Sequence, residues 1–229
     1  MGDARRGRTV TDRHPIGLAC GLALAAVSVI DLYTARALSL VAYVEPHVVA
    51  LVQWLDVGLG AICALGVVAV IVSWPFIIRE AHRRITLGVV AVQALGLTLD
   101  VVALLAAALF GKQAKPLYLL LEAGLVQLST VLLFATWYAA IDHDRQGAQD
   151  DRRPQRLAFP QQGTHFPGYE GWRPRFVDYL TFAFTTSAGL GPSEAMPLAV
   201  SAKLLVCFQV TLSLVILLVL AARAIGLIT

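Results

Sequence analysis

Long apolar stretches dominate this sequence and determine the solvent in which it can fold. They cover residues 15–38, 46–74, 85–110, 116–141 and 198–228. A helix needs about 20 apolar residues to cross the hydrocarbon core of a bilayer, and each stretch is long enough. Only 14% of the residues are charged, against about 25% in a typical soluble domain. We therefore expect an all-α polytopic membrane protein with about five transmembrane helices.

The segments between these stretches divide the chain into four parts. Residues 1–14 form a polar tail, and residues 15–141 form a membrane region of four helices. Residues 142–173 are rich in Asp, Arg, Gln, Gly and Pro, which predicts an aqueous loop that serves as a linker. Residues 174–229 contain a short amphipathic segment over 176–186, a turn and the last span.

The short segment is the first candidate for a functional site, because it looks too short to cross a membrane. We expect it to enter the bilayer as a re-entrant half-helix and to turn back. Non-helical backbone at membrane depth is tolerated only where protein buries it or water reaches it. Glycines in such a turn allow consecutive carbonyl groups to point one way, and rings of carbonyls replace the water shell of a cation in selective channels. The candidate residues are Thr185, Thr186, Ser187, Ala188, Gly189, Leu190 and Gly191. The alternative is that the two glycines only end a helix near the membrane interface.

The order of elements in this half of the chain resembles the pore module of potassium channels. Residues 116–141 match the outer helix, 176–186 the pore helix and 198–228 the inner helix. The segment Ser187-Ala188-Gly189-Leu190-Gly191 takes the place of the family's Thr-Val-Gly-Tyr-Gly, and Thr186 matches the preceding Thr. The resemblance implies a homo-oligomer, with four copies as a tetramer, that conducts a monovalent cation.

The sequence departs from that pattern in the filter and in the last helix. Leu190 replaces the usual aromatic residue, and Pro192 replaces the acid after the second glycine. No glycine lies between Gly191 and Gly226, so the hinge glycine common in channel inner helices is missing. These departures concern selectivity and gating rather than the order of the helices.

The whole chain also resembles an uncharacterised family of small bacterial integral-membrane proteins, a domain of unknown function. The motifs that carry this resemblance are Phe166-Pro167-Gly168, the segment 178–186, Met196-Pro197-Leu198 and Ala222-Arg223-Ala224. The resemblance implies a fold and a place in the bacterial inner membrane, but no activity.

The basic residues predict the orientation of the chain. With five crossings, 14 of the 18 Lys and Arg residues fall on the side of the N-terminus and of the loop 142–173. Short basic segments stay in the cytoplasm, which predicts a cytoplasmic N-terminus. The half-helix then enters from the cytoplasmic side, which is inverted relative to potassium channels. A full crossing by residues 174–192 would instead give six spans, with both termini inside.

Acidic residues within the spans are the second candidate site. Asp31, Asp56, Asp100 and Glu122 all fall in the same half of the membrane when neighbouring helices are antiparallel. Intramembrane acids are costly and usually face the interior of a bundle or a water-filled cavity. A functional interpretation is a cation or proton site. In the structural one, Asp31 and Glu122 reach the interface, where Arg36, Lys112 or Lys115 can pair with them.

Other polar residues in the spans are more typical of contacts between helices than of ligands. They are Gln93, Gln127, Gln209 and Ser213. No nucleophile elbow, phosphate-binding glycine loop or H-E-x-x-H motif is present, so we expect no enzyme and no cofactor. Loop residues such as Asp142-His143-Asp144 lack the fixed spacing of a metal site. The net charge of +3 is too small to indicate a nucleic-acid partner.

Three functions remain open from the sequence. The first is an oligomeric cation channel, potassium-type, whose pathway is lined by Thr186 to Gly191. The second is a proton- or cation-coupled transporter that uses Asp56 and Asp100. The third is a structural or assembly membrane protein without transport activity.

Overall fold

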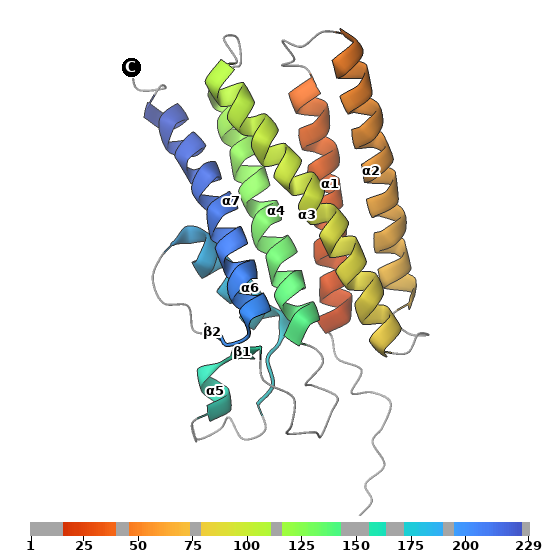
Figure 1. The fold of residues 1–229 in the computed structure, drawn as a ribbon, viewed down its shortest axis with the longest axis vertical. Helices are drawn as coiled ribbons and strands as arrows, with labels where there is room; N and C mark the ends of the chain where they lie inside the picture. Colours follow the sequence, from red (N-terminus) through yellow and green to blue (C-terminus); the bar gives the residue numbers. More distant parts are fainter. Residues whose placement is uncertain are drawn as a thin grey trace, which may run out of the picture.

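The computed structural model describes residues 16–39, 46–73, 79–110, 116–142, 156–163, 172–189 and 195–225. Within these ranges the chain is almost entirely helical (Figure 1), which confirms the all-α prediction. The elements are α1 (Ile16–Ser39), α2 (Pro46–Ser73), α3 (Arg79–Phe110), α4 (Pro116–Asp142), β1 (Leu157–Ala158), α5 (Pro160–Gly163), α6 (Phe176–Ala188), β2 (Met196–Pro197) and α7 (Val200–Ile225).

Four of the helices are long and apolar enough to cross a membrane. These segments are Ile16–Thr34 in α1, His82–Leu105 in α3, Leu120–Asp142 in α4 and Val200–Ala222 in α7. In α2, the described residues contain a shorter apolar segment, Gly60–Val72. Large apolar side chains such as Leu65, Leu99 and Leu214 are exposed on the outside of the bundle, as expected where lipid is the solvent. The chain is therefore a multi-pass integral membrane protein.

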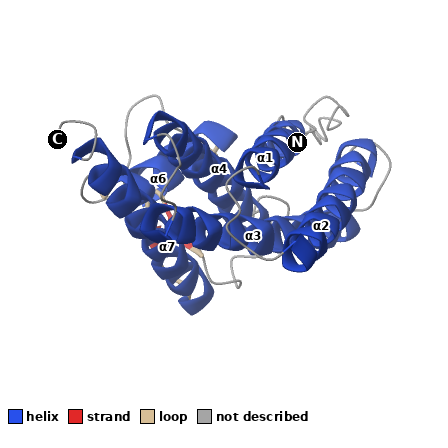
Figure 2. Ribbon diagram, turned by 90° about the horizontal axis from the view of Figure 1, so that it is seen from above, coloured by secondary structure: helices blue, strands red, loops and turns tan. Residues whose placement is uncertain are grey.

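The long helices form a bundle in which α4 is central. It contacts α1, α3, α6 and α7, and Figure 2 shows α2 and α7 at opposite sides of the bundle. The α4 span is 67% buried within the protein, against 33% to 39% for the other three. Because α4 has neighbours on two opposite faces, it can hold polar contacts on both.

Glycine allows α2 to approach its neighbours closely. A Cβ built at Gly66 would lie 2.6 Å from Cγ2 of Val89 in α3, and one at Gly21 in α1 would lie 2.9 Å from Cγ1 of Ile71 in α2. Small residues at helix contacts favour association in membranes, where no hydrophobic force acts between helices. These two contacts fix the height of α2 against α1 and α3.

The start of α3 differs from the sequence prediction. The third apolar stretch begins at residue 85, whereas α3 begins at Arg79, within the basic run from Arg79 to Arg84. Arg and Glu are good helix formers, so charged residues extend the helix beyond its apolar part. Charge marks the limit of the membrane span and not the limit of the helix.

Helix α6 lies in the segment between β1 and β2, which starts and finishes at the same end of the bundle. It has 13 residues, which span about 20 Å, less than the 30 Å or so of a hydrocarbon core. Strand β1 precedes α6 and strand β2 follows it. The two strands pair antiparallel, with Leu157 opposite Pro197 and Ala158 opposite Met196. The chain therefore returns after α6 to the place from which it came (Figure 1).

Part of the expected linker is folded onto this end. Leu157 and Phe159 are buried, and the Phe159 ring contacts the rings of Trp172 and Tyr179 at centroid distances of 5.7 Å and 5.5 Å. The polar composition of residues 142–173 hid these two apolar side chains. Residues 156–163 thus form a small base beside the start of α6.

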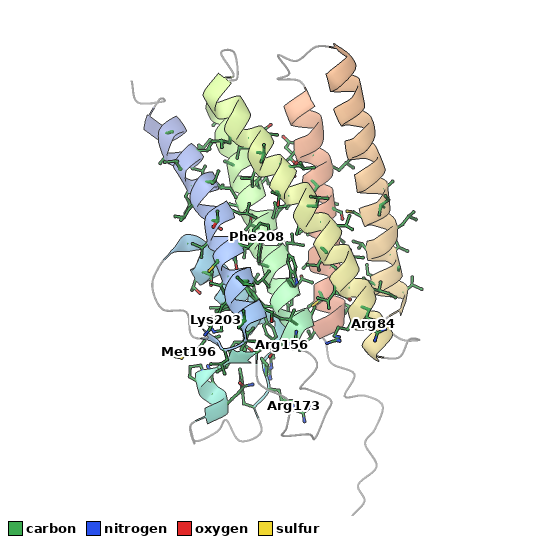
Figure 3. The ribbon with its side chains drawn as sticks, viewed as in Figure 1. Arg84, Arg156, Arg173, Met196, Lys203 and Phe208 are labelled. Carbon is green, nitrogen blue, oxygen red and sulfur yellow. The ribbon has the colours of Figure 1, made fainter. Side chains whose placement is uncertain are left out.

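Basic side chains gather at the same end. Figure 3 shows Arg156, Arg173 and Lys203 near the start of α7, and Arg84 at the same end of the bundle near the start of α3. Arg173 and Lys203 are exposed. This end of the bundle is the one that the charge distribution of the sequence assigns to the N-terminal side.

Candidate functional site at the tip of the half-helix

The start of α6 is fixed by local hydrogen bonds. Arg175 precedes the helix in extended conformation, and its backbone N–H donates to Oδ2 of Asp178 at 2.6 Å. An acidic side chain in the first turn also interacts favourably with the positive end of the helix dipole. One turn further, the Tyr179 hydroxyl donates to Oδ2 of Asp142 at the end of α4, at 2.7 Å. Sequence and packing together therefore set the angle at which α6 leaves the base.

The tip of α6 is fixed by the side chain of Gln209 in α7. Its Nε2 donates to the Ala183 carbonyl and to Oγ of Ser187, both at 2.7 Å. Its Oε1 accepts from the Tyr138 hydroxyl of α4 at 2.7 Å. Gln209 and Tyr138 are fully buried and Ser187 is 2% exposed. One amide thus joins α4, α6 and α7 in an apolar interior.

Aromatic packing supports this network. The ring of Phe182 meets that of Tyr138 edge to face at a centroid distance of 4.7 Å, which is a favourable geometry for aromatic pairs. Phe134 of α4 packs against Phe208 of α7 at 5.7 Å. The buried face of α6 consists of Tyr179, Phe182, Ala183 and Ser187, which are spaced as expected for one side of a helix.

The tip of α6 ends close to the middle of the bundle. Gln209 lies nine residues into α7, about 14 Å along the helix axis, and the α7 span runs from Val200 to Ala222. Gly189 follows the helix with φ 64° and ψ 20°, in the left-handed region, and it is exposed. A helix that ends here leaves its last carbonyls without intrahelical donors, and it places the negative end of its dipole at the same depth.

The residues of the predicted filter-like turn divide into three groups. Thr185, Thr186, Ser187 and Ala188 belong to the last turn of α6, and Gly189 ends the helix. The Thr185 hydroxyl bonds back to the carbonyls of Thr181 and Phe182 at 2.9 Å and 3.1 Å, so it does not point away from its own helix. Leu190 and Gly191 lie outside the described residues. An extended filter segment, if formed, therefore begins no earlier than Gly189.

The structure places the predicted acidic residues on four different helices and does not make the described ones one cluster. Asp31 in α1 and Asp100 in α3 are half-buried. Glu122 in α4 is 4% exposed, and its Oε2 has no hydrogen-bond partner. Asp56 lies in α2, but its side chain is outside the described part of the chain. Among described residues, no three His, Cys, Asp or Glu side chains lie close enough together to hold a metal ion.

The sequence predicted that Gln209 contacts another helix, but it did not identify the residues with which Gln209 forms hydrogen bonds. Asp142 was considered only with its loop neighbours, and Tyr138 lies near the end of the fourth apolar stretch. Both are buried hydrogen-bond partners. The signal available in the sequence was a single amide in a long apolar helix, since such a group is stable only with a partner.

Neither a scan against protein-family models nor searches of curated proteins and of solved structures returned a match for this chain.

Proposed function

We propose that the protein is an oligomeric cation channel in which the tip of α6 borders the conducting pathway. The observation that carries this proposal is the position of the α6 C-terminus, at mid-depth and next to the exposed Gly189. Helix C-termini and unwound carbonyls at the membrane midplane are groups that coordinate monovalent cations in transport proteins. The order of helices that resembles a potassium-channel pore module supports the same proposal.

The surroundings of the tip favour an aqueous or protein neighbour over lipid. Lipid tails offer no donors to the last carbonyls of α6, and unsatisfied backbone groups in hydrocarbon cost several kcal/mol each, as a rough guide. Water or another subunit can meet this need. A pathway filled with water at Gly189 satisfies the carbonyls and supplies a route for ions.

The outer face of α6 gives the contact through which copies assemble. Val177, Thr181 and Phe184 are exposed and lie one turn apart on a single side of the helix. A ring of carbonyls needs several copies around one axis, and this face lies beside the tip. A strictly monomeric protein with full cation flux would contradict the assembly proposed here.

Cation flux in liposomes tests the proposal. We expect wild-type protein to pass potassium or sodium, and Gly189→Val to lose the flux or change the preference between the two ions. The physical reason is that a residue other than glycine in the left-handed region costs about 1–2 kcal/mol, so valine displaces the backbone at the tip.

Gly124→Val is the matched control. A Cβ at either glycine meets no atom within 4 Å, but only Gly189 among the described glycines has a positive φ. Gly124 is exposed within α4, so valine there adds the same side chain without the strain of a left-handed backbone. No flux from folded wild-type oligomers, or equal flux from both variants, would refute the proposed role of the tip.

The proposed location is the bacterial inner membrane, with the base of α6 in the cytoplasm. The basic side chains at this end support the orientation, because short basic segments stay inside. A cysteine introduced at the exposed Arg173 should remain unlabelled by a membrane-impermeant thiol reagent in intact cells and become labelled after lysis. Labelling in intact cells would reverse the orientation.

A further inference from the structure

Helices α1, α3 and α4 share a second polar interior, on the face of α4 opposite to α6. Their relative heights follow from two contacts. Arg83 of α3 and Ala139 of α4 line one small pocket. In α1, the Leu24 carbonyl and the Ser28 hydroxyl accept from Nε2 of Gln93 in α3, at 3.1 Å and 2.7 Å.

These contacts place polar residues of the three helices in layers. Helices α3 and α4 are antiparallel, so a step along one is matched by a step back along the other. Gln93 lies ten residues after Arg83, and Ser129 lies ten residues before Ala139, so the two positions are level. Ser28 of α1 lies at the same height, because its hydroxyl accepts from Gln93. We name Ser28, Gln93 and Ser129 the amide layer.

A second layer lies seven residues further along. One step of seven residues brings Asp100 of α3 level with Glu122 of α4, about 10 Å above the amide layer. On α1, Asp31 lies three residues after Ser28, about 5 Å along the helix, so it lies between the two layers. We name Asp100 and Glu122 the carboxylate layer.

Several oxygens in these layers have no partner within the described protein. They are Oε2 of Glu122, Oε1 of Gln93 and Oγ of Ser129, and all three side chains are at least 95% buried. Buried polar atoms are hydrogen-bonded in the large majority of cases, and each exception calls for an explanation. An ionised carboxylate without a partner is especially unfavourable in an apolar interior. A bound proton removes the charge of Glu122.

We propose that the carboxylate layer is a proton-binding site in which Glu122 carries the bound proton. By the same residue steps, Asp100 of α3 lies at the height of Glu122, and Asp31 of α1 lies between the two layers. Near the end of α7, Arg223 reaches this height, and its side chain lies outside the described residues.

The route to this site comes from the end of the bundle where α4 begins. Glu122 lies six residues, about 9 Å, from the first residue of α4. Between the carboxylate and amide layers, Leu97 and Val126 are 0% and 2% exposed and form an apolar barrier. The proton therefore exchanges with the compartment opposite to the base of α6. This inference is independent of ion flow at Gly189.

Modification by dicyclohexylcarbodiimide, an uncharged apolar reagent, tests the proposal in the full-length protein in liposomes. A protonated carboxyl adds across one C=N bond of the carbodiimide: its proton passes to nitrogen, its oxygen bonds to the central carbon, and the adduct rearranges to a stable N-acylurea. We expect Glu122 to be modified at neutral pH, with modification declining as the pH is raised. Peptide mass mapping locates the modified residue.

Glu122→Gln should remove the modified peptide, and Glu122→Asp should retain modification at that position. Asp142→Asn is the matched control and should leave modification of Glu122 unchanged, because Asp142 is hydrogen-bonded to Tyr179 on the opposite face of α4. Elution as a single folded species is required of each variant. Unmodified Glu122 in folded wild type would overturn the proposal. So would protection by sodium at constant pH, which would indicate a metal cation in place of the proton. The assay needs no ion flux, so failure of the channel proposal leaves its outcome unaffected.

Discussion

Gln209→Leu should lower the stability of the protein by about 2 kcal/mol, because it removes three buried hydrogen bonds at about 0.6 kcal/mol each in a membrane interior. The hydroxyl of Tyr138 and the carbonyl of Ala183 both lose this partner. Leucine has nearly the same size as glutamine, so the loss reports the polar contacts rather than a cavity. Reversible unfolding by sodium dodecyl sulfate in mixed micelles measures the free energy of unfolding.

The same substitution should loosen α6 selectively. Gln209 donates two hydrogen bonds from α7 to the last two turns of α6. The first turn of α6 is held separately, through Asp142 and Asp178. Hydrogen exchange should therefore accelerate at the tip of α6 and less at its first turn.

Gln127→Leu serves as the control for chemistry and size. Gln127 lies in α4, and its buried Oε1 has no hydrogen-bond partner. Replacing a poorly satisfied amide by an apolar side chain is nearly neutral or stabilising. An equal loss of stability in both variants would show that the Gln209 network contributes nothing specific.

Gly66→Ala should destabilise the contact between α2 and α3 by about 1–3 kcal/mol, the usual cost of overpacking a well-packed interior. The added methyl would lie 2.6 Å from Cγ2 of Val89, a distance that real contacts do not reach. Either the Val89 side chain or the whole of α2 must move. Unfolding in mixed micelles measures the loss, and crosslinking between α2 and α3 reports the separation.

Gly88→Ala provides the comparison on the facing helix. Gly88 is next to Val89 in α3, but a Cβ there meets no atom within 4 Å. Because alanine is about 0.8–1.0 kcal/mol better than glycine in a helix interior, this variant should be neutral or slightly more stable. If the two alanine variants behave alike, the close approach of α2 to α3 does not occur.

The sequence by itself determined the class of fold. Apolar stretches long enough to cross a bilayer predicted the helices, and prolines at residues 46 and 116 marked two of their starts. These features are local, because the bilayer imposes length and hydropathy on each helix separately. The sequence also showed that the segment that forms α6 is too short to cross the bilayer, because span length is likewise a local feature.

The sequence also contained the polar residues of both candidate sites, but not their partners. A lone glutamine in an apolar helix requires a hydrogen-bond partner, which identified Gln209 as a contact residue. Its bonds to Tyr138 and Ser187 join positions 71 and 22 residues away. No local pattern specifies which of the bundle's other helices supplies such a partner.

Only the tertiary structure decided heights, faces and neighbours. The pairing of β1 with β2 returns the chain to one end, and Gln209 holds the tip of α6 near mid-depth. The packing of α3 against α4 sets the height of Asp100 relative to Glu122. The sequence alone gives only approximate limits for each span, so it does not fix this relative height. Helix heights depend on side-chain contacts such as Gly66 with Val89. They are therefore settled by packing between helices, whereas the helices themselves are settled by the bilayer.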